Sequence, residues 1–126
     1  MMTKKTNRRR YPRIPLVAPV RFTDDRLHQT CKAMIRHIAT HGAGLYTTEP
    51  VEKGDRLLVE LSLVTDENES LDESILGQVV WSAPLKEEGR RLVGVYFEKL
   101  EARHPKLHSY ITRLGKAVLS SEETWE

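Results

Sequence analysis

The chain has 126 residues and a mass of 14.5 kDa, with 30% charged and 39% hydrophobic residues. This length supports one hydrophobic core, and the composition is that of a globular domain. Because Cys31 is the single cysteine, an internal disulfide and a multi-thiolate zinc site are both excluded. Residues 1–15 lack the apolar core of a signal peptide and no apolar run reaches about 18 residues, so we expect a cytoplasmic protein without membrane insertion.

Charge is distributed unevenly along the chain. Residues 1–23 contain seven basic residues and no acid, whereas the rest of the chain contains 13 basic and 18 acidic residues. This asymmetry predicts an anionic partner for the N-terminal segment. We expect residues 1–7 to form a disordered tail and residues 8–15 to form an extended basic arm, because Pro12 and Pro15 disfavour a helix.

Alternation of apolar and polar residues predicts about six strands with no helix between them. The strands are expected near residues 16–22, 29–38, 42–47, 57–63, 75–81 and 93–97. Pro19 indicates an edge or a bulge in the first strand, and the polar segment 65–70 is expected to be a loop. The absence of helices between the strands excludes parallel βαβ units and favours an antiparallel barrel or sandwich.

The hydrophobic period changes after Leu100, where residues 101–120 are expected to form a C-terminal helix. One apolar face of this helix is formed by Leu107, Ile111, Leu114 and Val118. Pro105 suits the first turn, and Gly115 is expected to interrupt the helix. The narrow apolar stripe is most simply explained as a cap on one end of the barrel, and alternatively as a partner surface. We expect residues 121–126 to form an acidic tail.

Few residue clusters have the pattern of a catalytic or metal-binding site. A group of possible metal ligands, which matches no common zinc spacing, consists of His28, Cys31, His37 and His41. We expect Cys31 to lie in the core, His104 and His108 to lie on the surface, and Asp72 and Glu73 to lie in a solvated loop. No context pairs a nucleophile with a base, so we expect a protein that is not an enzyme and has no metal or cofactor.

The basic arm contains Arg9, Arg10 and Arg13 within five positions. A guanidinium group presents a planar set of donors that matches phosphate oxygens or the O6/N7 edge of guanine, and it also stacks on flat rings. The arm is therefore a candidate for binding an anion on the barrel face. A solvated tail with nonspecific attraction to polyanions explains the same charge.

Four segments of this chain resemble the PilZ domain family. Arg9-x-x-x-Arg13, placed directly before a strand, resembles the RxxxR motif that opens PilZ domains. Residues 37–42 correspond to the family's Asp/Asn-x-Ser-x-x-Gly motif, and the strands at 77–81 and 93–97 are also similar. The resemblance covers roughly residues 8–100. It implies an all-β, six-stranded antiparallel barrel of PilZ-like, split-barrel type with a C-terminal α-helix, and cyclic di-GMP as the ligand.

The resemblance also implies roles for single residues. Arg9 and Arg13 would contact phosphates and guanine, and Gly42 would allow close approach of the backbone. His37 stands where the family has the carboxylate or amide that accepts hydrogen bonds from guanine, and Ala39 replaces the serine. Because a neutral imidazole offers one acceptor and alanine none, we expect binding weakened by about one to three decades, with relaxed base selectivity.

Three functions remain open from the sequence. The first is a cyclic di-GMP receptor or adaptor that signals to an unidentified protein partner in bacterial motility, adhesion or secretion control. The second is a PilZ-fold interaction module that has lost the nucleotide. The third is a small barrel that binds nucleic acid nonspecifically, which the net acidic body and the scarcity of aromatic residues argue against.

Overall fold

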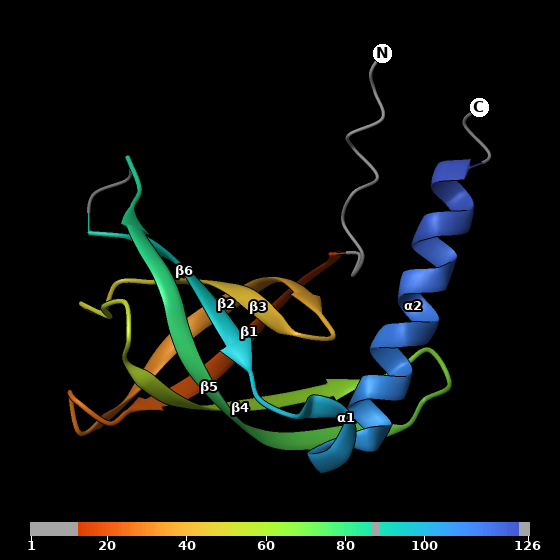
Figure 1. Ribbon diagram of the computed structural model, residues 1–126, viewed down its shortest axis with the longest axis horizontal. Coiled ribbons are helices and arrows are strands. Elements are labelled where there is room, and N and C mark those ends of the chain that lie inside the picture. The colour runs from red at the N-terminus through yellow and green to blue at the C-terminus, as the bar shows by residue number, and fades with distance from the viewer. Residues whose placement is uncertain (1–12, 87–88, 124–126) are drawn as a thin grey trace.

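The computed structural model of the chain describes residues 13–86 and 89–123. In these ranges the elements are β1 (Ile14–Asp24), β2 (Gln29–Ala39), β3 (Gly42–Thr47), β4 (Arg56–Val64), β5 (Ser70–Pro84), β6 (Arg91–Phe97), α1 (Leu100–Arg103) and α2 (Pro105–Glu123). The strands form a closed antiparallel barrel in the order β1-β2-β3-β6-β5-β4 (Figure 1). The barrel expected from the sequence, with its C-terminal helix, is therefore confirmed.

The barrel interior is filled by apolar side chains that alternate with outward-facing residues along the strands. The largest fully buried ones include Phe22, Ile35, Leu45, Leu57, Ile75 and Val93. Leu107 and Ile111 of α2 are also buried in this cluster. In Figure 1, α1 and the first turns of α2 lie against the end of the barrel where β4 turns into β5. The helix therefore caps the core. No helix in the described ranges is long and apolar enough to cross a membrane.

Three register shifts interrupt the alternation. One lies between Pro15 and Ala18 where β1 pairs with β2, just before Pro19, near the irregularity that the sequence indicates. The second lies between Ile35 and His37, where β2 pairs with β3, and the third lies between Val79 and Trp81, where β5 pairs with β6. The shift after Ile35 changes which side chains of β2 face outward beyond it, whereas β1 keeps its alternation through its own shift.

Strand β5 begins earlier than the sequence predicts, so the prediction that Asp72 and Glu73 lie in a solvated loop is wrong. Asp72 Oδ1 accepts a hydrogen bond of 2.7 Å from the Ser62 hydroxyl on β4. Glu73 Oε1 lies 2.7 Å from His104 Nδ1, and the two side chains are only 19% and 14% exposed. His104 thus ties the start of α2 to β5 and is not a surface residue.

The C-terminal helix also differs from the expectation. The segment forms a short α1 and a longer α2, which begins at Pro105 as the proline position indicates and continues to Glu123. Gly115 does not interrupt α2, and it is buried. Glycine costs a helix about 1 kcal/mol, which burial of the α2 apolar face offsets.

Candidate functional site

Residues 37–42, which we call the motif segment, connect the end of β2 to the start of β3. Strict alternation from Cys31, Ala33 and Ile35 would direct His37 into the core. The register shift after Ile35 instead buries Ile38 and leaves His37 and Ala39 half-buried. Both side chains therefore lie on the outer face of the barrel, where a ligand could reach them.

His37 belongs to a row of paired residues that crosses four strands. It pairs with Gly44 on β3, Gly44 pairs with Gly94 on β6, and Gly94 pairs with Trp81 on β5. A Cβ added to Gly44 would lie 2.5 Å from His37 Nε2, and one added to Gly94 would overlap Nε1 of Trp81. The imidazole and the indole therefore lie over the two glycines and form a continuous ring-covered surface.

A second row of paired residues runs beside the first. Ala39 pairs with Gly42, Gly42 with Tyr96, and Tyr96 with Gln78. A Cβ added to Gly42 would overlap the carbonyl oxygen of Val95 on β6. Gly42 is therefore required for the close approach of β3 to β6, whatever else it does.

Trp81 and Tyr96 give this face an apolar, aromatic character. Each residue is 42% exposed, so part of each aromatic side chain is open to solvent. Flat exposed rings are surfaces on which bases or guanidinium groups stack. The sequence allowed Trp81 a place on the barrel face, but it gave no reason to place the ring beside His37.

Arg13 is an exposed residue directly before β1. Its neighbour Ile14 pairs with Ile38, and Pro15 pairs with His37, so the chain enters the barrel beside the motif segment. Arg9 and Arg10 lie outside the described residues. The sequence-predicted groups that the structure brings together are therefore Arg13, the β2 positions 37 and 39, and Gly42.

At the opposite end of β1, a cluster of charged residues around two buried aspartates has a different character. Arg26 donates to both carboxylate oxygens of Asp55, at 3.0 Å from Nε and 3.1 Å from Nη2. The backbone N–H of Glu52 donates to the same carboxylate at 3.0 Å. Asp24 Oδ1 accepts from the backbone N–H groups of Arg26 and Leu27. These bonds fasten the β1–β2 turn to the segment before β4.

The pKa values of the two carboxyl groups in this cluster are shifted in opposite directions. Burial raises the pKa of Asp24, and the neighbouring carboxyl group of Asp55 adds to the effect. Burial alone would also raise the pKa of Asp55, but the bonds from Arg26 and the Glu52 N–H outweigh it and lower the pKa. The two shifts thus favour the neutral form of Asp24 and the charged form of Asp55, relative to an ordinary aspartate. We interpret the cluster as a structural clamp.

The possible metal ligands named from the sequence include Cys31, a buried residue of β2. Burial raises the pKa of the Cys31 thiol, which disfavours the thiolate that a metal would need. Cys31 is a core residue, as expected. Residues 13–86 and 89–123 contain no group of three or more histidine, cysteine or acidic side chains placed to hold an ion.

The sequence and the fold of this chain are similar to those of known proteins. The family model for the PilZ domain matches residues 7–113. Among solved structures, the PilZ domain with c-di-GMP of YcgR from Escherichia coli is 13% identical, with a TM-score of 0.63 over 94% of this chain and 96% of that chain. Among curated proteins, none matches the sequence significantly.

Two longer proteins have the same fold in part. The Bacillus subtilis inhibitor of motility MotI/DgrA is 14% identical, with a TM-score of 0.70 over 90% of this chain and 53% of that chain. The K. pneumonia MrkH–c-di-GMP complex is 15% identical, with a TM-score of 0.57 over 95% of this chain and 56% of that chain. The present chain thus spans about half the length of these two structures. At such identities the likeness establishes the fold alone.

Proposed function

The chain belongs to the PilZ domain family, whose members are receptor or adaptor modules, and we propose that it binds cyclic di-GMP weakly and signals to a protein partner. The observation that carries the proposal is the entry of the chain into β1. Arg13 precedes Ile14 and Pro15, which pair with Ile38 and His37. A guanidinium group at that point can reach a phosphate bound beside the motif segment.

The proposed ligand has two kinds of group that this face can bind. Its phosphates are anionic, and charge-assisted bonds from arginine to phosphate are stronger than neutral ones. Its guanine bases are flat, and the exposed rings of Trp81 and Tyr96 offer surfaces for stacking. A nucleotide bound on the rows that cross β2, β3, β6 and β5 would therefore contact arginine through its phosphates and the aromatic rings through its bases.

Positions 37 and 39 reduce the polar recognition of the base. An alanine cannot hydrogen-bond through its side chain, and an imidazole cannot offer the two acceptor oxygens of a carboxylate. A good base-edge contact contributes roughly 1–3 kcal/mol of discrimination, and a neutral hydrogen bond about 0.5–1.5 kcal/mol. We therefore propose a receptor with reduced affinity and little preference for guanine.

The packing of His37 favours a second candidate function. The imidazole ring lies over Gly44, in the outer-face row where a ligand base would approach. If this ring stays in place, it fills part of the area that a base would need. In that case the domain would be a PilZ-fold interaction module without nucleotide binding.

Titration calorimetry with cyclic di-GMP at low salt tests the proposal. We expect heat with the unmodified protein, and affinity reduced roughly tenfold or more by Arg13→Ala. Arg103→Ala, at an exposed position on α1, is the matched control and should leave affinity unchanged. Changing His37→Asp together with Ala39→Ser should increase affinity by about one to three decades.

The same titrations separate the alternatives. No heat with the unmodified protein, but tight binding after the double change, would establish the second candidate. No heat with either protein would overturn the nucleotide proposal. Steeply salt-dependent binding of any RNA with no preference for the cyclic dinucleotide would instead indicate the nonspecific nucleic-acid function.

A further inference from the structure

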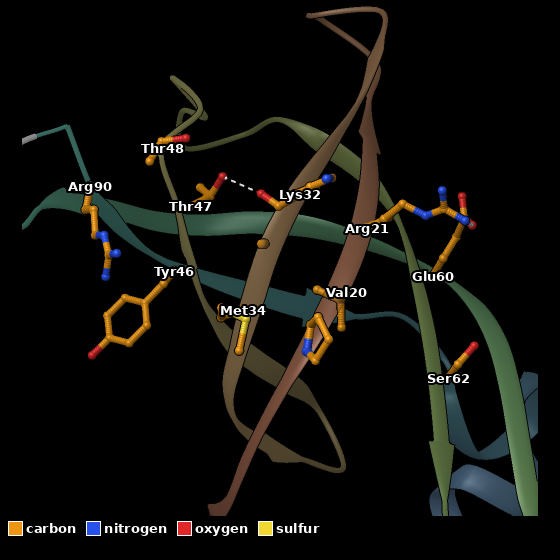
Figure 2. Close-up of a pocket in the computed structure, with 12 residues that line it drawn as sticks. Val20, Arg21, Lys32, Met34, Tyr46, Thr47, Thr48, Glu60, Ser62 and Arg90 are labelled. Carbon is orange, nitrogen blue, oxygen red and sulfur yellow. Dashed lines mark hydrogen bonds and ion pairs between the residues drawn. The ribbon is translucent and has the colours of Figure 1, made fainter.

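A groove with a volume of about 600 Å³ lies on the outer face of β1, β2 and β3, and none of the motif-segment residues line it. Figure 2 shows Tyr46 and Arg90 on one side of this groove, Arg21 and Glu60 on the opposite side, and Met34 between them. The groove therefore shares no lining residue with the proposed nucleotide site, although its Met34–Tyr46 row runs beside the His37–Gly44 row.

The groove floor is an apolar stripe set by strand register. Pro19 on β1 pairs with Met34 on β2, and Met34 pairs with Tyr46 on β3. Met34 is 39% exposed, so its flexible thioether side chain is available for contact. Neighbouring strands lie about 4.8 Å apart, so the stripe is about 10 Å long, the reach of about three residues of extended chain.

Positive charges flank the stripe. Lys32 pairs with Arg21 in the adjacent row, and Arg90 lines the end near Tyr46. On the other side of the stripe, the Arg36 guanidinium carbon lies 5.2 Å from the centre of the Tyr46 ring. Among the described residues, the acidic one that lines the groove is Glu60, whose Oε1 is 4.0 Å from Arg21 Nη2.

This charge distribution contrasts with the rest of the barrel. After residue 23 the chain contains 13 basic and 18 acidic residues, yet the groove gathers arginine and lysine around an apolar floor. Tyrosine, methionine and arginine are the residue types enriched in protein interfaces, because they combine apolar area with directed polar contacts. The matching ligand has carboxylates on both sides of an apolar side chain.

We propose that this groove binds an acidic peptide segment of a partner protein, with one aromatic or aliphatic side chain placed over Met34. Carboxylates before and after that side chain would contact Lys32 and Arg21 on one side and Arg90 on the other. The groove is open and lies across three strands, a shape that accommodates an extended segment. The proposal does not depend on cyclic di-GMP, and its test uses the protein without nucleotide.

Selection from a displayed library of random peptides, about 12 residues long, tests the proposal. We expect enriched peptides with several carboxylates around an apolar residue. As synthetic peptides they should bind the unmodified protein and lose roughly tenfold or more in affinity with Met34→Glu, and likewise with Lys32→Glu combined with Arg90→Glu. Leu76→Glu, on β5, and Lys116→Glu, on α2, are matched controls that should leave affinity unchanged.

Four outcomes would overturn the proposal. In two of them the selection enriches no peptide, or enriches peptides without carboxylates. In the third, the enriched peptides bind the groove variants as tightly as they bind the unmodified protein. In the fourth, sedimentation shows a dimer that Met34→Glu converts to a monomer. The last result would assign the groove to a second copy of the chain. Thermal unfolding of each variant verifies that the barrel remains folded.

Discussion

The two parts of the motif segment are constrained by different contacts. At Gly42 the absent Cβ leaves room for the carbonyl oxygen of Val95, so the backbones of β3 and β6 themselves require glycine. His37 and Ala39 are half-buried side chains on the outer face of β2. Gly42 is therefore explained by the barrel alone, whereas the residues at 37 and 39 bear directly on what the face can bind.

The same contrast distinguishes the two ends of β1. At its last residue, Asp24 joins a cluster with Arg26 and Asp55 in which side-chain and backbone N–H groups donate to the two buried carboxyl groups. At its start, exposed Arg13 lies beside an outer face whose polar groups are few. Substitutions at the first kind of position should change folding stability, and those at the second should change binding.

The largest effect is expected for Gly42→Ala. The added methyl group would overlap a backbone atom of β6, which cannot rotate away as a side chain can, so the β3–β6 pairing must open. We expect a loss of about 3 kcal/mol or more in the free energy of unfolding, measured by urea denaturation. Ala39→Ser is the control from the same segment and should change stability by about 0.5 kcal/mol or less. Equal midpoints for both variants would contradict the assignment of Gly42 to the fold.

A smaller effect on the free energy of unfolding is expected in the charged cluster. There the substitution of aspartate by asparagine should have different effects at positions 55 and 24. Asp55→Asn replaces a carboxylate that accepts from Arg26 and from the Glu52 N–H, so stability at pH 7 should fall by about 2 kcal/mol. Asp24→Asn keeps the acceptor for the Arg26 and Leu27 N–H groups and replaces a carboxyl group whose raised pKa favours the neutral form. Its stability at pH 7 should be unchanged or higher.

The contributions of Asp55 and Asp24 to the free energy of unfolding are expected to change with pH in opposite directions. The pKa of Asp55 is lowered from 3.8, so its stabilisation is present above that pH and is lost as the pH falls below it. Asp55→Asn should therefore differ least from the unmodified protein in acid. The pKa of Asp24 is raised, so its stabilisation is present below pH 3.8 and is lost as the pH rises. An Asp24→Asn protein that is less stable at pH 7 would contradict this assignment.

The sequence predicts the barrel well because its core residues alternate with period two. It fails where polar residues occupy strand positions, as in the first part of β5. There Leu71 and Ile75 are buried, and Glu73 lies between them on the same face of β5. Its carboxylate contacts His104, which lies 31 residues away in the sequence. Such a long-range partner leaves no local signal, so the segment has the composition of a loop.

The candidate site is only partly predictable for a similar reason. The motif resemblance identifies His37, Ala39 and Gly42, but strict alternation would have directed His37 inward. The register shift after Ile35 depends on how β2 pairs with β3, which no residue of β2 encodes alone. The neighbourhood of His37 and Trp81 results from pairings across four strands, so the aromatic surface emerges only in the folded barrel.

The smallest effect, and the finest test of the outer face, is expected for Gly44→Ala. Its methyl group would meet the His37 ring, a side chain that can rotate, so the cost should be about 1 kcal/mol and less than that of Gly42→Ala. In a His37→Ala background the obstacle is gone, and alanine is favoured over glycine in a strand by roughly 0.5–1 kcal/mol. The same change should then be neutral or stabilising.

This reversal of sign is measured as a double-mutant cycle from urea denaturation of the four proteins. A coupling free energy of about 1 kcal/mol or more between positions 37 and 44 is expected, because the two groups occupy one space. The ring of His37 then rests on Gly44 in solution, where it would stand in the path of a base. If the effects of the two substitutions on stability are additive, the His37 ring does not pack on Gly44 in solution. The packing of His37 would then no longer support a domain without nucleotide binding.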